Sequence, residues 1–525
     1  MLLNLTSLYV AAAAGSVLFA LLYRVAVYFV DNDGLRKFHN MSLFSGFSNL
    51  PLIMVAHKSF RSDYLRQCHQ KHDVLRIGPK HLSFSDPTVI KDIYGHGSKA
   101  YKDDFYLITA ASSGHMHLAD VADKTEHARK RKVLSAAYAL KNLEDWEHKV
   151  ADKVERMFKH FDQRCTDPLP ECQTVPKPQD LNINYRAWTN FFTVDAIADI
   201  GLSEKLGFLD RGDDTCAARN LDGTTFQASF RHSLYNNARK QSLLSHSYTS
   251  YKLLDKLTAW IPGIYRTGTC AARNWDAIVL QRSQARLDAY KRGEKLEDFF
   301  QVLMEDKNGK ANNLEWGEIN AEVNIMMNAG STTTAIALAN VLYHLLKHPQ
   351  VLAKLRLEVD AVLEPDEVVA PYNKVKNLPY LRACLDESLR IFSPTTHNLG
   401  RKTPPDGMWV GEHFIPGGIS VSMSAHVVHR NETVFPKADQ YIPERWLGES
   451  GKTLQPYFLA FSAGSRGCIG RNISYLEQTV LLASLVHRYE FALPDPDWEV
   501  ERLEAMNLLV GDIPLKVWKR EIAGH

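Results

Sequence analysis

The stretch FSAGSRGCIG, from Phe461 to Gly470, places one cysteine among three glycines and an arginine. A cysteine that binds a metal must be a thiolate, which nearby hydrogen-bond donors and positive charges stabilise. Gly464 permits a turn that other residues resist, and Gly470 lets a flat group approach the backbone. Because Cys468 directly precedes a predicted helix over residues 470–489, its sulfur can accept amide hydrogens and lies near the positive end of the helix dipole. The pattern predicts a metal-binding thiolate, and a buried free cysteine in a glycine-rich turn is the alternative.

The same ten residues fill every fixed position of FxxGxRxCxG and therefore resemble the haem-binding signature of the cytochrome P-450 family. The resemblance implies that Cys468 is the axial ligand of the iron of haem b. It also implies that Arg466 faces a haem propionate and that Phe461 keeps water from the sulfur. Gly464 and Gly470 are then cofactor-binding positions of the loop.

Two further motifs follow in the order that the family requires. ESLR contains Glu387 and Arg390 three residues apart on one helix face, and PERW contains Arg445. The resemblance assigns these three residues to a buried network that braces the cysteine loop. Two arginines around one carboxylate are a sensible way to bury charge, since an unpaired partner costs several kcal/mol. A solvated surface pair is the alternative for the first motif alone.

Basic residues elsewhere resemble the propionate-binding positions of the family. In TEHARKRKVLSAAY, Arg131 takes the arginine position of a W-x-x-x-R motif and His127 replaces the usual tryptophan. Arg401, in HNLGRK, fits the propionate arginine after the E-x-x-R helix. Each could instead be a solvated surface charge. Two interpretations stay open for the neighbouring cations Arg129, Lys130 and Lys132: a solvated helix face and a docking site for a reductase.

The segment MNAGSTTTA resembles the distal-helix motif of the family. Ala329 and Gly330 would leave a gap in the helix wall for dioxygen, and Thr333 takes the threonine position that holds a water near the bound oxygen. A threonine that bonds to its own helix is the alternative for Thr333. Thr332 stands where the family has a carboxylate. Because a threonine cannot ionise, proton delivery is the part of the resemblance that this sequence alters.

The hydrophobic periodicity predicts a mainly α protein with a small β portion, and the resemblance implies the cytochrome P-450 fold, with haem between a long distal helix and a proximal cysteine loop. Helices are expected over residues 314–346, 349–363, 379–391 and 470–489, and a short β segment over 74–84. The middle of the chain is expected to be helical, with looser stretches at 164–180 and 205–225. Hydrophobic residues make up 45% and charged residues 23%, which is typical of a globular protein with a large core.

The first 23 residues carry no charge, and Arg24, Arg36 and Lys37 follow them. About 20 apolar residues can cross a bilayer, and the basic residues beyond them predict a retained anchor with a cytosolic body. A cleavable signal peptide is the alternative. We therefore expect an anchor and flank over residues 1–30, one catalytic haem domain over 31–525, and a single-pass location in the endoplasmic reticulum membrane.

The bulk composition restricts the partners. A net charge of +2 is no sign of a nucleic-acid-binding protein. Seven cysteines without CxxC spacing indicate reduced thiols and no disulfide framework or zinc knuckle.

The resemblance implies a monooxygenase that inserts one oxygen atom of O2 into a medium-sized lipophilic substrate. Its electrons come from NADPH through a separate NADPH–cytochrome P-450 reductase, because no flavin or nicotinamide domain fits in the remaining length. The motif residues resemble those of filamentous-fungal members of the family, many of which tailor secondary metabolites. Detoxification of aromatic compounds, a haem-thiolate isomerase or dehydratase, and a tethered binding protein with an inactive haem fold are the alternatives. The substrate pocket is expected to draw on residues 101–121, Met326, Ala329, residues 394–399 and residues 507–509.

Overall fold

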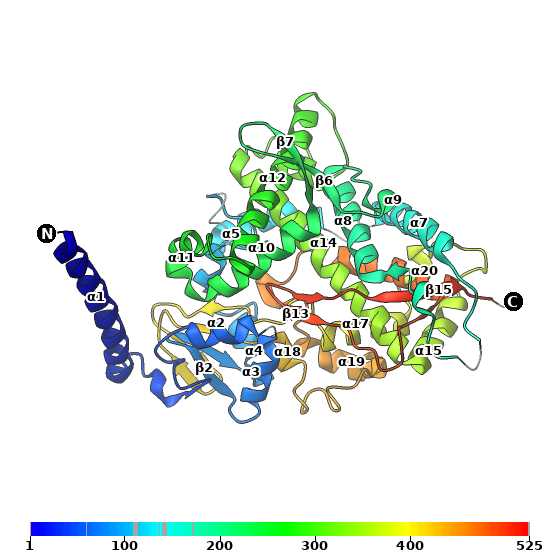
Figure 1. Cartoon of the computed structure of the whole chain (residues 1–525). Helices are drawn as coiled ribbons and strands as arrows, with labels where there is room; N and C mark the ends of the chain where they lie inside the picture. Colours follow the sequence, from blue (N-terminus) through cyan, green and yellow to red (C-terminus); the bar gives the residue numbers. More distant parts are fainter. Residues whose placement is uncertain are drawn as a thin grey trace.

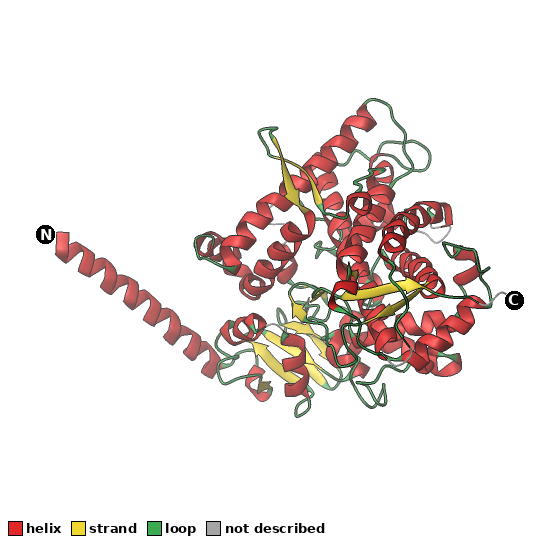
Figure 2. Cartoon of the chain, turned by 45° about the vertical axis from the view of Figure 1, so that its right-hand side comes forward, coloured by secondary structure: helices red, strands yellow, loops and turns green. Residues whose placement is uncertain are grey.

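Long helices make up most of the chain, as the sequence predicts (Figures 1 and 2). The structure is a computed structural model that describes residues 2–58, 60–108, 114–135, 137–138, 144–170 and 173–522. Its α-helices are α1 (Leu2–Val30), α2 (Leu50–His57), α3 (Arg61–His69), α4 (Ile90–Tyr94), α5 (Lys124–Ser135), α7 (Glu147–Arg164), α8 (Tyr185–Leu202), α9 (Phe208–Arg211), α10 (Phe230–Leu244), α11 (Tyr251–Thr258), α12 (Ile264–Lys291), α13 (Phe299–Met304), α14 (Trp316–Lys347), α15 (Pro349–Asp360), α16 (Tyr372–Val375), α17 (Pro379–Ile391), α18 (Ala425–Val428), α19 (Gly448–Leu454) and α20 (Arg471–Arg488).

The strands form small sheets beside the helices, and the largest has the order β1-β2-β3-β11-β8-β4. A second sheet has the order β12-β15-β5, and three pairs remain: β9–β10, β13–β14 and β6–β7. The strands are β1 (His39–Asn40), β2 (Val74–Gly78), β3 (His81–Phe84), β4 (Tyr101–Lys102), β5 (Ile183–Asn184), β6 (Thr215–Arg219), β7 (Thr225–Ser229), β8 (Arg401–Lys402), β9 (Met408–Val410), β10 (His413–Ile415), β11 (Ser420–Ser422), β12 (Tyr489–Ala492), β13 (Arg502–Glu504), β14 (Leu508–Val510) and β15 (Pro514–Lys519).

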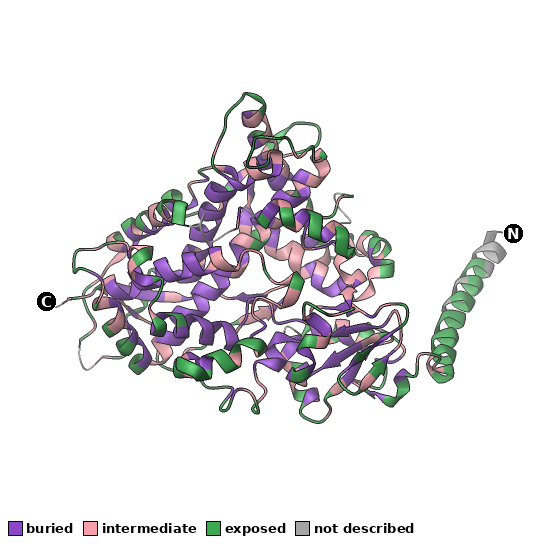
Figure 3. Cartoon of the chain, turned by 180° about the vertical axis from the view of Figure 1, so that it is seen from behind, coloured by how far each residue is buried: buried purple, intermediate pink, exposed green. Residues whose placement is uncertain are grey.

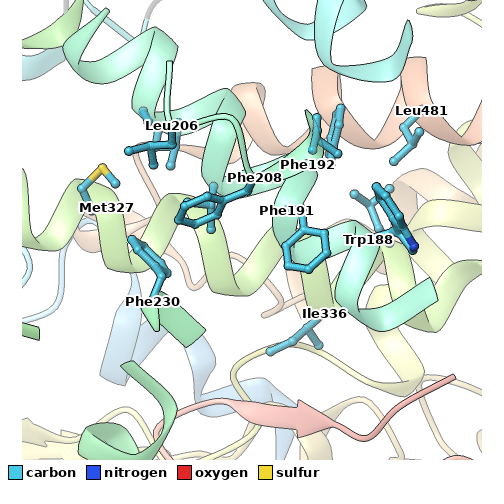
Figure 4. Packing of buried hydrophobic residues seen from close by; sticks show 14 of the residues in the cluster. Trp188, Phe191, Phe192, Leu206, Phe208, Phe230, Met327, Ile336 and Leu481 are labelled. Atoms are coloured by element: carbon cyan, nitrogen blue, oxygen red, sulfur yellow. The ribbon is translucent and has the colours of Figure 1, made fainter. Parts of the chain in front are cut away.

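The long helix α14 runs through the middle of the molecule and contacts α8, α12, α17 and α20. Its partner α8 is buried at almost every position, so it is a core helix and not an amphipathic surface helix. Aromatic and aliphatic side chains of α8, α14 and α20 interlock between them, including Phe192, Met327 and Leu481 (Figure 4). This packing fixes α14 relative to α20, the helix that follows the cysteine loop.

The four predicted helices correspond to α14, α15, α17 and α20, and the predicted β segment is the hairpin β2–β3. One prediction is wrong in detail. Residues 205–225 were expected to be loose, but they contain α9, strand β6 and the start of strand β7. The two strands turn at Gly223, whose φ of 89° favours glycine, and Arg282 of α12 donates a hydrogen bond to the Ala217 carbonyl. A contact from a distant helix supports this hairpin, which explains why local sequence does not predict it.

Helix α1 projects to one side of the remaining helices and strands (Figures 1 and 3). Its Tyr9–Val30 segment is apolar and long enough to cross a membrane, and it is not buried against the rest of the protein. Length and composition alone make this a weak indication of a membrane anchor.

Candidate functional site

The cysteine loop folds back on itself before α20. The Cys468 amide donates a 2.9 Å hydrogen bond to the Phe461 carbonyl, and the Gly467 amide donates a 3.0 Å bond to the Gly464 carbonyl. Gly464 has a φ of 64°, and a side chain there would overlap the carbonyl of Tyr94. The loop therefore needs glycine at this position, for the reason that the sequence suggested.

The Cys468 side chain faces an interior cavity of about 450 Å³, and this cavity accounts for its accessibility to water. Burial raises the pKa of its thiol. Hydrogen bonding to the Gly470 backbone opposes this rise, as do the positive charges of Arg131 and Arg471. A metal cation bound at the sulfur would complete this stabilisation of the thiolate.

The cavity brings together most of the site residues that the sequence predicts. Cys468, Arg466, Phe461 and Gly470 contribute from the loop, His127 and Arg131 from α5, and Arg401 from β8. Ala329, Gly330 and Thr333 contribute from α14. All of the expected pocket segments contribute as well, except that residues 109–113 lie outside the described residues. The lining residues from those segments are Lys102, Phe105, Tyr106, His117, Leu118, Ala119, Asp120, Met326, Ala329, Pro394, Thr395, His397, Leu399 and Asn507.

One wall of the cavity is strongly cationic. In the register of strands β4 and β8, Lys102 lies directly opposite Arg401, although like charges in this position repel each other. Burial is the largest cause that lowers the pKa of Lys102 and of His127. The positive charge of Arg466 lowers both pKa values further. Within the described part of the chain, the side chains of Lys102, Arg401, Arg466 and Arg131 make no ion pair with a carboxylate. This wall therefore favours an anionic ligand.

Backbone carbonyls hold the cationic side chains in position. Arg466 donates 2.6 and 2.8 Å bonds to the carbonyls of Val121 and Ala122, and Arg131 donates a 2.7 Å bond to the carbonyl of Gly467. His127 is buried among these cations, and burial with their charge lowers its pKa to about 4. It is therefore a neutral ring at pH 7, able to donate one hydrogen bond to an anion.

The distal residues differ in what they face. The Thr333 hydroxyl donates a 2.8 Å bond to the Ala329 carbonyl within α14, as in the alternative that the sequence left open, and Thr333 also lines the cavity. A side chain at Gly330 would overlap Ile197 of α8, so this glycine serves the close contact between the two helices. Gly330 also lines the cavity, and its expected role in leaving room for dioxygen stays a prediction.

The expectation for Thr332 needs a correction. It is buried, it does not belong to the lining of the cavity, and its hydroxyl has no hydrogen-bond partner among the described residues. In the helix it points toward a different side from Thr333, since adjacent residues are about 100° apart. The structure therefore gives Thr332 no direct contact with the cavity.

Glu387, Arg390 and Arg445 form one buried network. Both oxygens of Glu387 accept 2.8 Å bonds from Arg390, and one also accepts a 3.0 Å bond from Arg445. Trp446 donates a further 2.8 Å bond to Glu387, and Arg390 donates 2.7 Å bonds to backbone carbonyls at His429 and Ala438. The network joins α17 to the PERW segment, with every charge paired.

The cationic cluster on α5 is less available than the sequence suggested. Lys130 is buried, and its ammonium group forms ion pairs of 2.6 Å with Glu318 and 3.0 Å with Glu322. Arg129 is also paired, with Glu126 at 2.7 Å. Of these three residues, Lys132 is the exposed one that forms no ion pair within the described part of the chain, so the proposed docking cluster reduces to this residue.

The sequence analysis assigned no role to four polar side chains at the site. Lys102 belongs to no motif, and only its strand register beside Arg401 reveals it. Thr334 and Ser474 line the cavity and share a 2.9 Å hydrogen bond between α14 and α20. Glu477 lies beside Thr334 with its carboxyl buried, and burial raises its pKa well above the usual value. The available signal was a glutamate three residues after a serine in the helix expected over residues 470–489.

Comparisons with known proteins agree with this geometry. The family model described as Cytochrome P450 matches residues 45–517. The chain belongs to the cytochrome P450 family. Benzoate 4-monooxygenase bphA of Aspergillus niger is 28% identical over 457 residues, which cover 86% of each chain. Cytochrome P450 monooxygenase cicH of Emericella nidulans is 30% identical over 448 residues, 82% of this chain and 83% of its own.

A solved structure also shares the fold. A cytochrome P450 named CYP102L1 superposes with a TM-score of 0.68 over 89% of this chain and 96% of its own, at 19% identity. At this identity the match shows the fold alone. The mainly α fold predicted from sequence is thus confirmed, as is the family.

The residues of this P450 fit the haem that the family implies. The cavity offers a sulfur donor at Cys468, and its cationic wall lacks carboxylate partners among the described residues. A haem carries two propionates that such a wall would neutralise. A Cβ atom at Gly470 would lie 4.0 Å from the Cys468 sulfur, so the glycine keeps the space beside the sulfur free of a side chain. Arg131, Arg401, Arg466, Lys102 and His127 are the groups that would hold the propionates.

Proposed function

We propose that this P450 is a monooxygenase that inserts one oxygen atom of dioxygen into a medium-sized lipophilic organic substrate. The balanced reaction consumes one O2, two electrons and two protons for each substrate, and yields the oxygenated product and one water. The observation that carries the proposal is that Cys468 and Thr333, from separate elements, line one cavity. Family membership and the names of the fungal monooxygenase relatives support the same class.

Bound haem would supply the redox chemistry that activates dioxygen. The chain's own residues would prepare the site for it. Cys468 provides a thiolate that amide hydrogens and the charge of Arg131 stabilise. Phe461 lines the cavity beside the sulfur and limits the access of water. The cationic wall would hold the cofactor's carboxylates.

Proton supply would depend on hydroxyl groups. Thr333 can release its bond to the Ala329 carbonyl and hold a water in the cavity. Thr332, in the position where the family has a carboxylate, cannot ionise and does not line the cavity. We therefore assign proton handling to Thr333 and ordered water, with Ala329 forming the adjacent wall.

The proposed electron donor is NADPH, acting through a separate NADPH–cytochrome P-450 reductase. Lys132 is the residue of the α5 cluster still free to contact an acidic partner. The proposed substrates are secondary metabolites, since the relatives include several fungal monooxygenases. Oxidation of a simple aromatic compound is the alternative, because one relative is named for benzoate.

The proposed location is the endoplasmic reticulum membrane, with α1 as a single-pass anchor and residues 31–525 as one cytosolic catalytic domain. The apolar, unburied Tyr9–Val30 segment supports this assignment.

The test is oxygen consumption by the purified full chain with NADPH, a fungal P450 reductase and a panel of lipophilic substrates. A monooxygenase gives a product that carries one atom of labelled dioxygen. Turnover without oxygen consumption would instead identify an isomerase or dehydratase.

A further inference from the structure

One part of the cavity carries polar side chains that the chemistry above does not use. It is formed by α10, α12 and α14, and α12 packs against both of the others. The side chains there that end in an amide or a carboxyl group are Asn237, Gln241, Asp276, Asn324 and Asn328. These helices are separate from the cysteine loop and from the strands that carry the cationic wall.

Asp276, on α12, is the charged member of this group. Within the described part of the chain it makes no hydrogen bond and no ion pair, whereas Glu322 in the same cavity is paired with Lys130. Its side chain is accessible to water, and it lines the cavity. Burial alone raises its pKa to about 6, with no contribution from a neighbouring charge. At pH 7 the cavity therefore contains a carboxylate without a counter-ion.

We infer that Asp276 is a specificity-determining residue that binds a cationic nitrogen of the substrate. The inference rests on the proposed function and narrows its substrate class to lipophilic compounds with a protonated or quaternary amine. A carboxylate that lines a cavity gains more from a bound cation than one on the open surface does, because the bound ligand displaces the waters that would screen the pair.

The surroundings of Asp276 suit such a ligand. Leu234, Ala238 and Ile325 of the same helices line the cavity and can cover an apolar body. Asn237 can hydrogen-bond to polar groups beside the nitrogen. In the haem-loaded protein the propionates would neutralise the wall at Arg401, so Asp276 is the charge that would direct the nitrogen of the substrate toward α12. An anionic substrate such as benzoate would meet repulsion from Asp276.

The experiment compares two probes of equal shape. Trimethyl(phenylbutyl)ammonium has a permanent charge and no lone pair with which to bind iron, and its isostere has carbon in place of nitrogen. Calorimetry with the haem-loaded full chain measures Kd for both. We expect the wild type to bind the ammonium ion about tenfold more tightly than the isostere, a preference of about 1.4 kcal/mol.

Three variants identify the cause. Asp276→Asn should abolish the preference without affecting the affinity for the isostere, and Asp276→Glu should retain part of it. Asp288→Asn is the matched control, because Asp288 lies on the same helix, outside the cavity lining, and accepts a bond from Gln284. It should leave both affinities unchanged. Thermal melting checks folding, which the removal of an unpaired charge should not impair.

The pH dependence gives a second signature. Since the ammonium probe does not titrate, its affinity should fall about fivefold from pH 8 to pH 5, because about nine-tenths of Asp276 is protonated at pH 5. Of the titratable groups on neighbouring helices, Lys240 of α10 is held in an ion pair. Glu322 of α14 is paired with Lys130, but burial raises its pKa too, so Asp276→Asn is the variant that separates the two carboxyls. Tyr251 of α11 has its pKa raised, mainly by burial, and remains neutral over this range. Asp276→Asn should therefore remove the fall.

Equal affinities of the wild type for the two probes, or no binding of the ammonium ion, would overturn the inference. So would a preference that survives in Asp276→Asn. None of these results would affect the proposed monooxygenase function, because haem binding and oxygen use do not require Asp276. Loss of oxygen-dependent turnover with every substrate would reject that function separately.

Discussion

The guanidinium group of Arg131 donates a 2.7 Å hydrogen bond to the carbonyl of Gly467, the residue before Cys468. One side chain of α5 thereby anchors the cysteine loop and places a positive charge near the sulfur. That charge also favours the thiolate form of Cys468. A helix about 340 positions away in sequence thus takes part in the chemistry of the loop.

We expect Arg131→Ala to reduce the haem content of the purified protein severalfold, because it removes both the anchor of the loop and a propionate partner. The measurement is the ratio of haem absorbance to protein concentration. Lys132→Ala is the control, since Lys132 is exposed on the next position of the helix. Equal haem content in the two variants would contradict the role of Arg131.

Glu387→Ala should destabilise the protein by about 3–5 kcal/mol, because it leaves Arg390 buried without its carboxylate. Denaturant unfolding of the haem-loaded protein measures the free energy of unfolding. Glu449→Ala removes an exposed glutamate whose pair with Lys452 is solvated, and it should change the stability by less than about 0.5 kcal/mol. Similar losses in both variants would show that the network adds no special stability.

Thr333→Val should leave haem bound and divert reducing equivalents from product into peroxide, because no hydroxyl then holds water in the cavity. The measurement is the ratio of peroxide to NADPH consumed. Thr332→Val is the matched control, since Thr332 does not line the cavity. It should keep the coupling and the stability of the wild type. If product formation by Thr333→Val stayed fully coupled to NADPH use, Thr333 would have no role in proton handling.

Glu477→Gln should stabilise the protein increasingly as the pH rises. Burial raises the pKa of Glu477 above its usual 4.5, so the folded state holds this proton more tightly than the unfolded chain does. Stability is then lost as the pH rises from about 4.5 toward the folded pKa, and each pKa unit corresponds to about 1.4 kcal/mol. Melting temperatures at pH 5 and pH 8 measure the effect.

In Glu449→Gln, which alters an exposed carboxyl, the difference from the wild type should not depend on pH. A Glu477→Gln variant that melts with the wild type at both values would mean that Glu477 is ionised in the folded state.

The sequence predicted the features that depend on local pattern. Proline and hydrophobic periodicity gave the start of α15 at Pro349 and both ends of α17. The motif around Cys468 predicted that this residue faces a cofactor cavity. The glycines and the helix start that position the sulfur all lie within ten residues, so local sequence is enough. The registers and contacts between distant segments could not be predicted in this way.

Three of the site's features depend on such distant contacts. Lys102 faces Arg401 only because strands β4 and β8 pair. The burial of Lys130 depends on Glu318 and Glu322 of α14, and the carboxyl of Asp276 reaches the cavity because α12 packs on α14. Charge in a sequence does not reveal whether a side chain meets solvent, a partner or a cavity.

The most direct test of the account is the carbon-monoxide difference spectrum of the reduced protein, recorded for the wild type and for Cys468→Ala. We predict the red-shifted Soret band of a thiolate-bound haem in the wild type and its complete loss in Cys468→Ala. A Cys468→Ala variant that kept this band would show that another group binds the iron, and would contradict the assignment of the site.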